Sequence, residues 1–370
     1  MKHNWTYKKL GEVATINYGT RVVQKRDGGT IYPVYGGGDA TFRMDTYNRE
    51  NCLVVARFAM SPKCTRRVVG KFFLNDSGLT LEAKEGVCQD YLDWHIIALN
   101  DEIYRTAKGA AQKNLDVKTF TSLSIGVPSL DEQQAIVREL DGINRLIDLQ
   151  EEQLREYDRL AQSLFYTTFG DPSTNPKGWE VKKLGEVCDV RDGTHDSPQY
   201  LQHSDYLLIT SKNIVDGRID FSTATNYISK EDYDAINKRS KVDVGDIIMP
   251  MIGTIGHPII VREAEQRYCI KNVALIKFCG NSDVVNTYVK MLIDSPSYMQ
   301  YILGLNKGGT QKFIALGTIR QLSLPIPPLS LQQSFAVQIE AIEQQKALIR
   351  RSLDDTRTLL AARMQYYFNS

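Results

Sequence analysis

Hydrophobic residues recur at alternating intervals of four and three positions along two long stretches of the chain, about 131–169 and about 330–368. This spacing is typical of a heptad seam, the narrow apolar stripe that one helix buries against another. A helix on a globular surface shows a wider stripe. Pro128 and Asp131 suit the start of the first helix, and Gly170-Asp171-Pro172 suits its end. We therefore predict two α-helices, each about 55 Å long at about 1.5 Å per residue.

The two predicted seams match position for position. The first seam runs through Ile136, Leu140, Ile143, Ile147, Gln150, Leu154, Tyr157, Ala161, Leu164 and Thr168. Adding 199 to each number gives the second seam, Phe335, Ile339, Ile342, Lys346, Ile349, Leu353, Thr356, Leu360, Arg363 and Tyr367. Each apolar seam needs a partner, so we predict that the two helices pack on each other. The charged members Lys346 and Arg363 could set the register at some loss of stability.

The segments that precede the helices show a different pattern, of short β-like runs separated by glycine-containing turns. In the first segment we predict strands at 52–56 and 67–74 and a helix at about 89–99. In the second segment we predict strands at 206–210, 246–250 and 273–278. Each segment is therefore expected to be a mixed α/β domain, the first dominated by a bent sheet.

Several motifs occur twice, in the same order. The motif W-x-x-K-K-L-G-E-V opens at Trp5 and again at Trp179, an offset of 174, with seven of nine positions identical between the two copies. The motif K-G-x-x-Q-K occupies 108–113 and 307–312, an offset of 199. The motif [V/I]-P-x-L-x-x-Q-Q occupies 127–134 and 326–333, at the same offset. The chain is thus a tandem duplication with a net insertion of 25 residues in the second copy.

The repeat predicts an α+β protein with four parts: a first globular domain at 1–129, a first long helix at 130–170, a second globular domain at 171–328 and a second long helix at 329–370. Only residues 170–178 link the first helix to Trp179, and they reach at most about 30 Å. The second domain is then expected near the far end of the first helix, and the second helix runs back antiparallel. Two similar domains would be separated by a two-helix coiled coil and related by a pseudo-twofold axis. The alternative is that each helix folds back onto its own domain.

The composition is that of a soluble protein: of 370 residues, 42% are hydrophobic and 24% charged, with no apolar run long enough to cross a bilayer and no signal peptide at the start. The six cysteines form no C-x-x-C pair, which argues against structural zinc and a disulfide framework, and favours the reducing cytoplasm. The net charge of +1 counts against a nucleic-acid binder, but it says nothing about local clusters of Arg and Lys.

Motifs for catalysis are lacking. The sequence contains no G-x-x-x-x-G-K-[ST] phosphate loop, no H-E-x-x-H zinc motif and no G-x-S-x-G nucleophile turn. Asp76 followed by Glu82-Ala83-Lys84 faintly resembles a metal-dependent nuclease site, but the spacing is short. We expect no catalytic residue and no metal ligand, and this favours recognition over catalysis.

A duplicated domain with a rigid spacer suits double-stranded DNA, which presents its grooves at a regular spacing. Arg and Lys match guanine edges, Asn and Gln match adenine, and Ser, Thr and Lys match phosphates. On this basis the candidate DNA contacts of the first domain are Thr20, Arg21, Tyr35, Gly37, Arg66 and Arg67. Those of the second domain are Arg191, Thr194, His195, Lys212 and Asn213.

The repeated K-G-x-x-Q-K loops add candidates with a shared task in both halves. They are Lys108, Gln112, Lys113, Lys307, Gln311 and Lys312. Because the loop is repeated, base reading is the less favoured role. Contact with the DNA backbone and packing of the domain against the helix remain equally open.

Taken together, the motifs and their order make the chain resemble the specificity subunit of type I restriction-modification enzymes. The resemblance covers the whole chain and includes Phe169-Gly170-Asp171-Pro172 at the end of the first helix. Three further stretches look typical of one class of target recognition domain in that family, 191–198, 211–214 and 251–256.

The resemblance implies that each globular segment reads one half of a split DNA site. It also implies that the helices dock two modification subunits, which methylate adenine with S-adenosylmethionine, and that ATP-driven restriction subunits join them. The chain would bind no cofactor itself, because S-adenosylmethionine, ATP and Mg²⁺ would belong to those partners. Lys346 and Arg363 could then face a partner subunit.

Two other classes of function stay open on the sequence alone. One is a self-contained DNA nuclease or methyltransferase with an unrecognised site, and the other is a coiled-coil scaffold without a DNA role. Near-neutral charge further suggests that the isolated chain binds DNA weakly.

Overall fold

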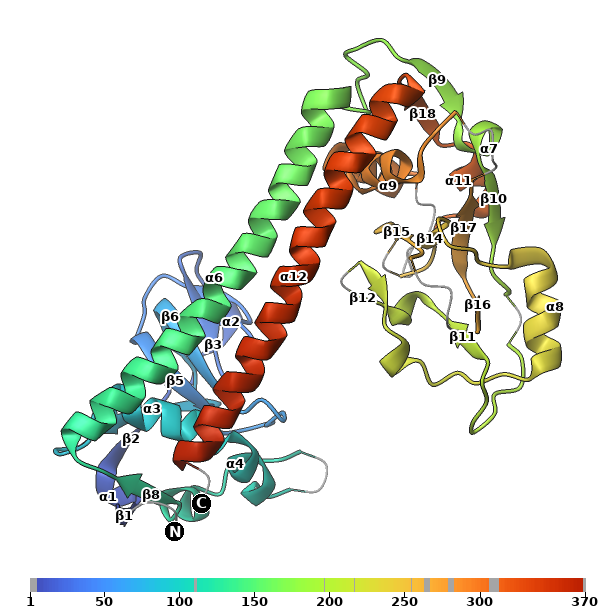
Figure 1. Ribbon diagram of the computed structural model, residues 1–370. Coiled ribbons are helices and arrows are strands. Elements are labelled where there is room, and N and C mark those ends of the chain that lie inside the picture. The colour runs from blue at the N-terminus through green and yellow to red at the C-terminus, as the bar shows by residue number, and fades with distance from the viewer. Residues whose placement is uncertain are drawn as a thin grey trace. The chain divides into compact units, whose positions relative to one another are not determined.

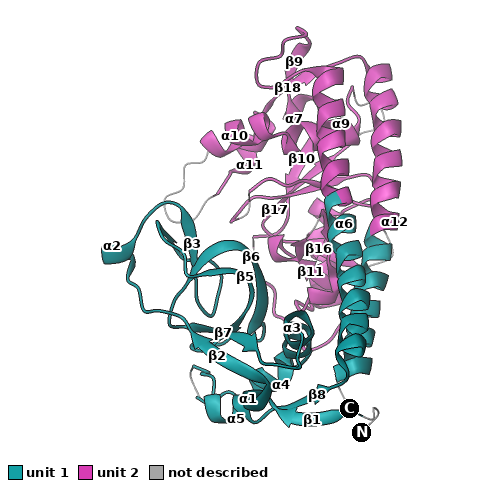
Figure 2. Ribbon diagram, turned by 90° about the vertical axis from the view of Figure 1, so that its left-hand side faces the viewer, with its two compact units in different colours: residues 1–152, 350–370 teal, residues 153–349 magenta. Residues whose placement is uncertain are grey.

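The computed structural model describes residues 5–109, 112–195, 197–215, 217–253, 255–262, 267–278, 283–305 and 313–368. The chain forms two compact units, Met1–Glu152 with Arg350–Ser370, and Gln153–Ile349 (Figure 2). Both predicted long helices are present: α6 spans Leu130–Phe169 and α12 spans Leu329–Phe368 (Figure 1). The boundary between the units crosses both helices, so each helix contributes one part to each unit.

A six-stranded sheet in the order β2-β7-β5-β6-β3-β4 dominates the first unit. Its strands are β2 (Ala14–Tyr18), β3 (Tyr32–Tyr35), β4 (Arg43–Met44), β5 (Arg49–Ala56), β6 (Thr65–Leu74) and β7 (Gly78–Ala83). Neighbours run antiparallel except β3 and β6, which run parallel. The register of β5 against β6 shifts between Glu50 and Cys52, an irregularity that bends a strand. The predicted strands at 52–56 and 67–74 are therefore confirmed.

Short helices and a separate strand pair complete the first unit. The helices are α1 (Leu10–Val13), α2 (Gln24–Asp27), α3 (Gln89–Ala98), α4 (Asn100–Thr106) and α5 (Val117–Thr121). Strand β1 (Thr6–Lys9) pairs antiparallel with β8 (Ser124–Val127), which leads directly into α6. The predicted helix at 89–99 corresponds to α3.

The second unit contains a four-stranded antiparallel sheet in the order β10-β17-β14-β15. Its strands are β10 (Asp189–Asp192), β14 (Ile247–Pro250), β15 (Ile259–Ile260) and β17 (Val273–Lys277). Three two-stranded pairs accompany it: parallel β11 (Leu207–Ile209) and β16 (Tyr268–Ile270), antiparallel β12 (Ile214–Val215) and β13 (Arg218–Ile219), and antiparallel β9 (Glu180–Lys183) and β18 (Ser323–Ile326). The predicted strands of this segment correspond to β11, β14 and β17.

The helices of the second unit were less visible in the sequence. They are α7 (Leu184–Val187), α8 (Lys230–Ser240), α9 (Asn286–Asp294), α10 (Pro296–Gly304) and α11 (Leu316–Arg320), with 3₁₀ turns at Ser211–Asn213 and Phe221–Thr223. Helix α8 has a recognisable start, because the Ser229 side chain accepts a hydrogen bond from the Asp232 backbone at 3.0 Å.

The repeated opening motif has the same structure in both units. Its K-K residues end β1 or β9, and its L-G-E-V residues form the single-turn helix α1 or α7. In each copy the motif's glutamate accepts the backbone N–H of the preceding lysine, Glu12 from Lys9 at 3.1 Å and Glu186 from Lys183 at 2.7 Å. This satisfies a backbone donor at the start of the turn and accounts for the spacing of the motif.

The long helices run antiparallel within each unit. In the first unit Gln150 donates to Ser352 at 2.8 Å, and Glu139 pairs with Arg363 further toward the end of α12. In the second unit the Phe165 ring lies 5.9 Å from the Phe335 ring, centroid to centroid. All the predicted seam positions are buried or half-buried. The heptad pattern therefore located the contact surface, and within each unit the helices pair with each other.

The first glutamine of the [V/I]-P-x-L-x-x-Q-Q motif, Gln133, fixes α6 to the first unit. Gln133 is fully buried; its Oε1 accepts the Cys88 N–H at 2.7 Å, and its Nε2 donates to the carbonyls of Gly86 and Pro128, both at 3.0 Å. Since the carbonyl of Pro128 lies just before the helix, this side chain ties the start of α6 to the turn that precedes α3.

Candidate nucleic-acid interface

The pair Gly19-Thr20 recurs as Gly193-Thr194, at the same offset of 174 as the opening motif, and has the same backbone contacts in both units. Gly19 and Thr20 follow β2, and their N–H groups donate to the carbonyls of Gly78 and Leu74 at 3.0 and 2.9 Å. Gly193 and Thr194 follow β10, and their N–H groups donate to the carbonyls of Val273 and Ile270, both at 3.0 Å. We call these two turns the Gly-Thr turns.

The glycine of each turn is required by a close backbone approach. A Cβ at Gly19 would lie 1.9 Å from the carbonyl oxygen of Asn75, and a Cβ at Gly193 would lie 2.3 Å from that of Ile270. Any side chain there would force the strands apart. Each Gly-Thr turn is thus a rigid loop at the end of a sheet, which suits a position that must present neighbouring side chains.

In the first unit three further loops meet at this end of the sheet. The Asn75 N–H donates to the Tyr35 carbonyl at 2.9 Å, and the Arg57 N–H donates to Ser77 at 2.8 Å. Arg66 donates to the Gly37 carbonyl at 2.5 Å. The predicted contacts Tyr35, Gly37 and Arg66 therefore lie together with the Gly-Thr turn.

The structure also places Arg57, which was not predicted from sequence, on this surface. Its guanidinium carbon lies 4.8 Å from the centre of the Tyr18 ring and 4.6 Å from that of Phe58, both exposed. Stacking on aromatic faces orients an arginine while leaving its N–H groups open to other acceptors. Sequence reasoning missed Arg57 because Tyr18 and Phe58 are far apart in the chain.

In the second unit a buried aspartate takes the place of this aromatic support. Asp192 is 6% exposed and precedes Gly193, as Tyr18 precedes Gly19. One carboxylate oxygen lies 2.8 Å from Nε2 of His195, and the other binds Arg239 from α8. Both partners have exposed side chains, so one buried carboxylate holds two exposed groups beside the Gly-Thr turn.

His195 is held on its other side as well. Its Nδ1 lies 3.0 Å from Oδ1 of Asn272, whose backbone has a positive φ of 57°. Lys271, which directly precedes Asn272 in the chain, donates a hydrogen bond to the Ser197 hydroxyl. The exposed His195 ring, predicted from sequence, is therefore fixed in orientation, whereas Arg239 and Lys271 were not predicted as part of this surface.

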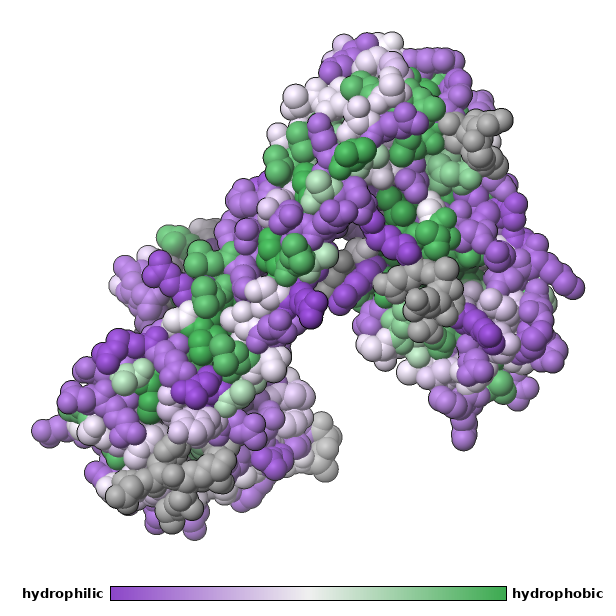
Figure 3. All heavy atoms as spheres, viewed as in Figure 1, coloured by the Kyte–Doolittle hydropathy of each residue, from purple (hydrophilic) through white to green (hydrophobic). Residues whose placement is uncertain are grey.

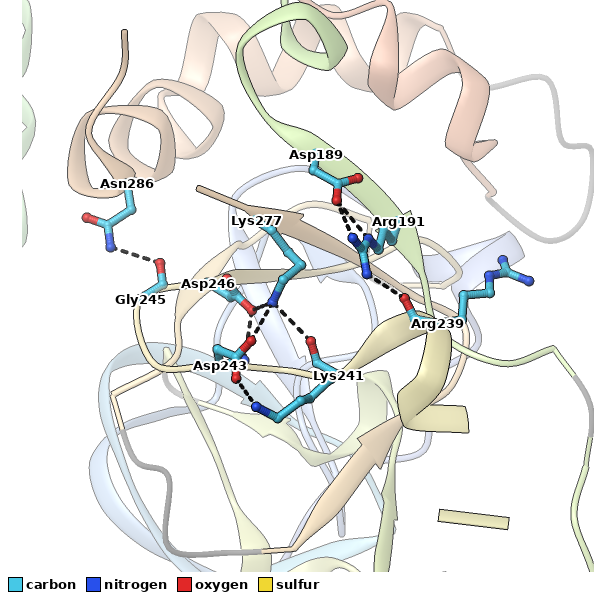
Figure 4. Close-up of polar contacts among 9 residues, drawn as sticks. All are labelled: Asp189, Arg191, Arg239, Lys241, Asp243, Gly245, Asp246, Lys277 and Asn286. Carbon is cyan, nitrogen blue, oxygen red and sulfur yellow. Dashed lines mark hydrogen bonds and ion pairs between the residues drawn. The ribbon is translucent and has the colours of Figure 1, made fainter. Parts of the chain in front are cut away.

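Arg191, another predicted DNA contact, binds residues of its own unit (Figure 4). Its guanidinium binds Asp189 at 2.5 Å and donates to the Arg239 carbonyl at 2.9 Å, so it connects β10 to α8. A second ion network lies nearby, in which Lys277 binds Asp246 at 2.5 Å and Asp243 at 2.9 Å. These contacts hold α8 and the following loop against the sheet.

Other predicted residues also have partners inside their own unit. Arg67 lies over the Trp94 ring at 4.3 Å and pairs with Asp141 of α6, so it connects the sheet to the long helix. Lys108 pairs with Asp116 at 2.5 Å, and Lys113 lies over the Tyr104 ring at 4.2 Å. The first K-G-x-x-Q-K loop thus packs on its own domain, with Gln112 exposed.

The remaining candidates divide by exposure. Thr20, Arg21 and Lys212 are exposed. Asn213 is 5% exposed, and its amide oxygen accepts the Thr210 N–H at 3.0 Å, so its side chain serves the turn that presents Lys212. Lys307, Gln311 and Lys312 lie outside the described residues.

Within the described ranges, no group of three or more His, Cys, Asp or Glu side chains is arranged to hold a metal ion. Among those same residues no helix combines the length and apolar character that a bilayer crossing requires. The faint nuclease pattern has other partners: Glu82 accepts from Asn17 at 3.2 Å and Lys84 donates to the Gly11 carbonyl at 2.7 Å.

Comparison with known proteins gives one consistent family. A family model for the type I restriction modification DNA specificity domain matches residues 2–157 and 176–355. The type I restriction enzyme MjaVIII specificity subunit of Methanocaldococcus jannaschii is 22% identical over 313 residues, covering 74% of this chain and 69% of that protein. The MjaIX specificity subunit of the same organism is 25% identical over 281 residues, covering 68% and 62%.

Solved structures agree on the fold. The S subunit of a type I restriction-modification system from M. genitalium has a TM-score of 0.59 at 13% identity, covering 99% of this chain and 96% of that one. A chain from a structural study of complex assembly and conformational transition in the type I R-M system has a TM-score of 0.53 at 18% identity, covering 98% and 97%.

Proposed function

This chain belongs to the family of type I restriction modification DNA specificity domains, and we propose that each of its units reads one half of a divided DNA site. The observation that carries the proposal is the pair of Gly-Thr turns. Their backbone contacts are equivalent, but the residue before each turn differs, Tyr18 in one unit and Asp192 in the other. A shared scaffold with different neighbouring groups supports two half-sites of different sequence.

The chemistry of each surface fits DNA. Arginine forms paired hydrogen bonds with guanine edges and with phosphates, and backbone amides and hydroxyls bind phosphates. Arg57 beside Tyr18, and Arg239 with His195 beside Asp192, are the groups we assign to these contacts. The predicted DNA contacts on exposed loops, Thr20 and Lys212 among them, remain part of this proposal.

We further propose that the outer faces of the long helices dock two copies of one modification subunit. Four exposed leucines form two equivalent pairs at the repeat offset of 199: Leu149 with Leu348, and Leu160 with Leu359. Hydrophobic side chains are visible over α6 in Figure 3. An exposed apolar group repeated in both halves supports two identical partners more directly than two different ones.

The chain itself is proposed to catalyse nothing. S-adenosylmethionine, ATP and Mg²⁺ would be held by modification and restriction subunits, and the transfer of a methyl group to adenine would take place there. Incubating the purified chain alone with DNA, Mg²⁺ and S-adenosylmethionine tests this, because any cutting or methyl transfer would favour a self-contained nuclease or methyltransferase.

The DNA-reading proposal is tested by mapping methylated adenines in a genome that carries this chain with its partner subunits. We expect one divided sequence with two defined halves. Affinity for duplex DNA should also fall steeply as salt rises, because phosphate contacts release counterions. Methylation without a common sequence, or salt-independent binding, would count against the proposal.

A further inference from the structure

Arg57 is a half-buried arginine without an acceptor beside the first Gly-Thr turn. Within the described ranges its guanidinium makes no hydrogen bond and no ion pair. Nearby arginines differ, because Arg66 donates to the Gly37 carbonyl and Arg49 donates to the Thr80 hydroxyl at 3.0 Å. Partly desolvated cations in folded proteins are normally paired, so the side chain of Arg57 calls for an acceptor from outside the chain.

Two aromatic rings restrict the orientation of this guanidinium. Its central carbon lies 4.8 Å from the centre of the Tyr18 ring and 4.6 Å from that of the Phe58 ring. Tyr18 is held in turn, since Arg49 of β5 donates to its carbonyl at 3.1 Å. A ring contact covers a face of a guanidinium and uses none of its N–H groups. Arg57 therefore presents its planar set of N–H donors in a restricted direction.

The backbone that carries Arg57 is fixed as well. The Arg57 N–H donates to the Ser77 carbonyl, and the Arg57 carbonyl accepts the Leu115 N–H, both at 2.8 Å. Two residues later Ala59 has a positive φ of 49°, and its N–H donates to Oδ1 of Asn114 at 3.2 Å. Residues other than glycine rarely adopt such a φ, and backbone strain of this kind is concentrated at functional sites. The fold thus spends conformational strain on the loop that presents Arg57.

The second unit has no arginine at the equivalent position. Leu115 and Ile314 are counterparts at the repeat offset of 199. The Ile314 N–H donates to the Met251 carbonyl at 3.0 Å, just as the Leu115 N–H donates to that of Arg57. Met251, which is 2% exposed, therefore stands where the first unit has Arg57. The shared scaffold forms without a cation at this point, so Arg57 is not needed to build it.

The arrangement of the donors favours a base edge over a phosphate as the acceptor. Guanine presents O6 and N7 side by side in the major groove, where one arginine binds both with paired N–H groups. A phosphate is bound equally well by a lysine or by a mobile arginine, because it accepts hydrogen bonds from many directions. A guanidinium fixed by two rings and a strained loop suits the acceptor pair of fixed geometry.

We propose that Arg57 reads a guanine in the half-site of the first unit, and that Tyr18 and Phe58 are positioning residues for this contact. The inference rests on the proposed function of DNA reading. It adds the identity of one base, the residue that binds it, and the absence of the same contact from the second unit, where Met251 replaces Arg57.

The test compares Arg57→Met and Arg57→Lys with the parent protein, each assembled with its partner subunits. Methionine is the residue at the equivalent position of the second unit, and lysine keeps the charge without the paired donors. Mapping of methylated adenines first defines both halves of the parent's site. When each base pair is then changed in turn, both variants should lose discrimination at one guanine by roughly five- to a hundredfold. The other half-site should be read as before.

Replacing that guanine by 7-deazaguanine separates base reading from phosphate binding, because the analogue lacks N7 but still pairs with cytosine. Methylation by the parent complex should slow by about fivefold or more, whereas Arg57→Met should show no further loss, since the contact is already absent. A phosphate contact gives a different result. Arg57→Met would then weaken binding to all sequences alike and lower the salt slope by about one, Arg57→Lys would bind normally, and the proposal would be overturned.

Arg105→Met is the matched control, because it removes one exposed positive charge from α4 of the same unit. It should leave both half-sites unchanged. If Arg57→Met does not assemble, Arg57→Lys on the 7-deazaguanine duplex gives the same readout. A parent complex that methylates no defined divided sequence would refute the proposed function itself. A defined site whose guanines are all read equally well by the parent and by Arg57→Met would refute this inference alone.

Discussion

Gln133 and Gln332 occupy equivalent positions in the two halves of the chain and make the same three hydrogen bonds. Gln332 accepts the Val285 N–H at 2.9 Å and donates to the carbonyls of Asp283 and Pro327 at 3.0 and 2.8 Å. Both side chains are fully buried. The repeated Q-Q pair of the sequence therefore anchors a long helix to its globular part, and does so twice.

Replacing either buried glutamine by leucine should destabilise its unit by about 3 kcal/mol, because buried backbone groups lose their partners. Denaturant unfolding measures the change. The matched controls are Gln134→Leu and Gln333→Leu at the exposed second glutamines, which should stay within about 0.5 kcal/mol of the parent protein. Equal effects at both glutamines of a pair would show that burial is not the cause.

Buried His95 should make the first unit sensitive to acid. Its ring lies 4.6 Å from that of Phe368, its Nδ1 has no hydrogen-bond partner among the described residues, and burial lowers its pKa to about 3. The unfolded chain binds a proton below about pH 6.5 and the folded one does not, so stability falls as pH drops from about 6.5 toward 3. In His95→Phe this loss should be absent. The free energy of unfolding of the variant, relative to that of the parent protein, should therefore rise by about 2 kcal/mol between pH 7 and pH 5, as measured by urea unfolding.

Asp93, on the same helix α3, should make stability change with pH in the opposite direction to His95. Burial raises its pKa to about 6, so the folded carboxyl keeps a proton that the unfolded one releases between about pH 4 and pH 6. Its charged form therefore weakens the fold above about pH 6. Asp93→Asn should stabilise the protein at pH 7, and the gain should shrink as pH falls toward 4. A gain that grew with acid would contradict the assignment.

Asp192→Asn should affect one half-site only. The change removes the charge that holds His195 and Arg239, and losing a well-placed base contact weakens discrimination by about 1–3 kcal/mol, or roughly five- to a hundredfold. Methylation of variant duplexes by the complex with its partner subunits measures this, with one half-site altered at a time. Lys230→Ala, which removes an exposed ion pair with Asp234 on α8, serves as the control. Equal loss at both half-sites would point to general unfolding.

Lengthening the helices should lengthen the DNA site. One extra heptad in both α6 and α12 keeps their seams in register and adds about 10 Å. If the helix pair sets the distance between the two reading surfaces, the gap between half-sites should grow by about three base pairs at about 3.4 Å each. Sequencing of methylated sites gives the answer, and an unchanged gap would show that the helices do not set it.

Exposed leucines on the helices should control the binding of partner subunits. Leu149→Arg and Leu348→Arg place a charge on equivalent surfaces, and each should weaken the binding of one modification subunit at least tenfold. Native mass spectrometry of the complex would show loss of a single copy in each case and of both in the double variant. Gln153→Arg adds a charge at an exposed position of α6 and should leave the stoichiometry unchanged.

Much of this architecture could be predicted from sequence because it depends on periodic patterns. The heptad spacing identified α6, α12 and all their seam positions, and the repeat offsets showed that both halves share one design. The sequence also showed that Lys346 and Arg363 are charged seam residues, but it did not show which residues they bind. In the structure Lys346 binds Asp158 and Glu343, and Arg363 binds Glu139. Two of these three ion pairs, Lys346–Asp158 and Arg363–Glu139, join α12 to α6, which supports a role in setting the register of the helix pair.

The candidate interface depended more on tertiary structure. Sequence identified Thr20 and Thr194 as candidates, but it gave no reason to place Arg57 on Tyr18 or Arg239 on Asp192, because those partners come from distant segments. It also could not show that Arg67 lies on Trp94 or that Asn213 is buried. A local pattern records which residues favour burial or a given backbone, whereas a binding surface is made where separate loops meet, and only the folded chain decides which loops those are.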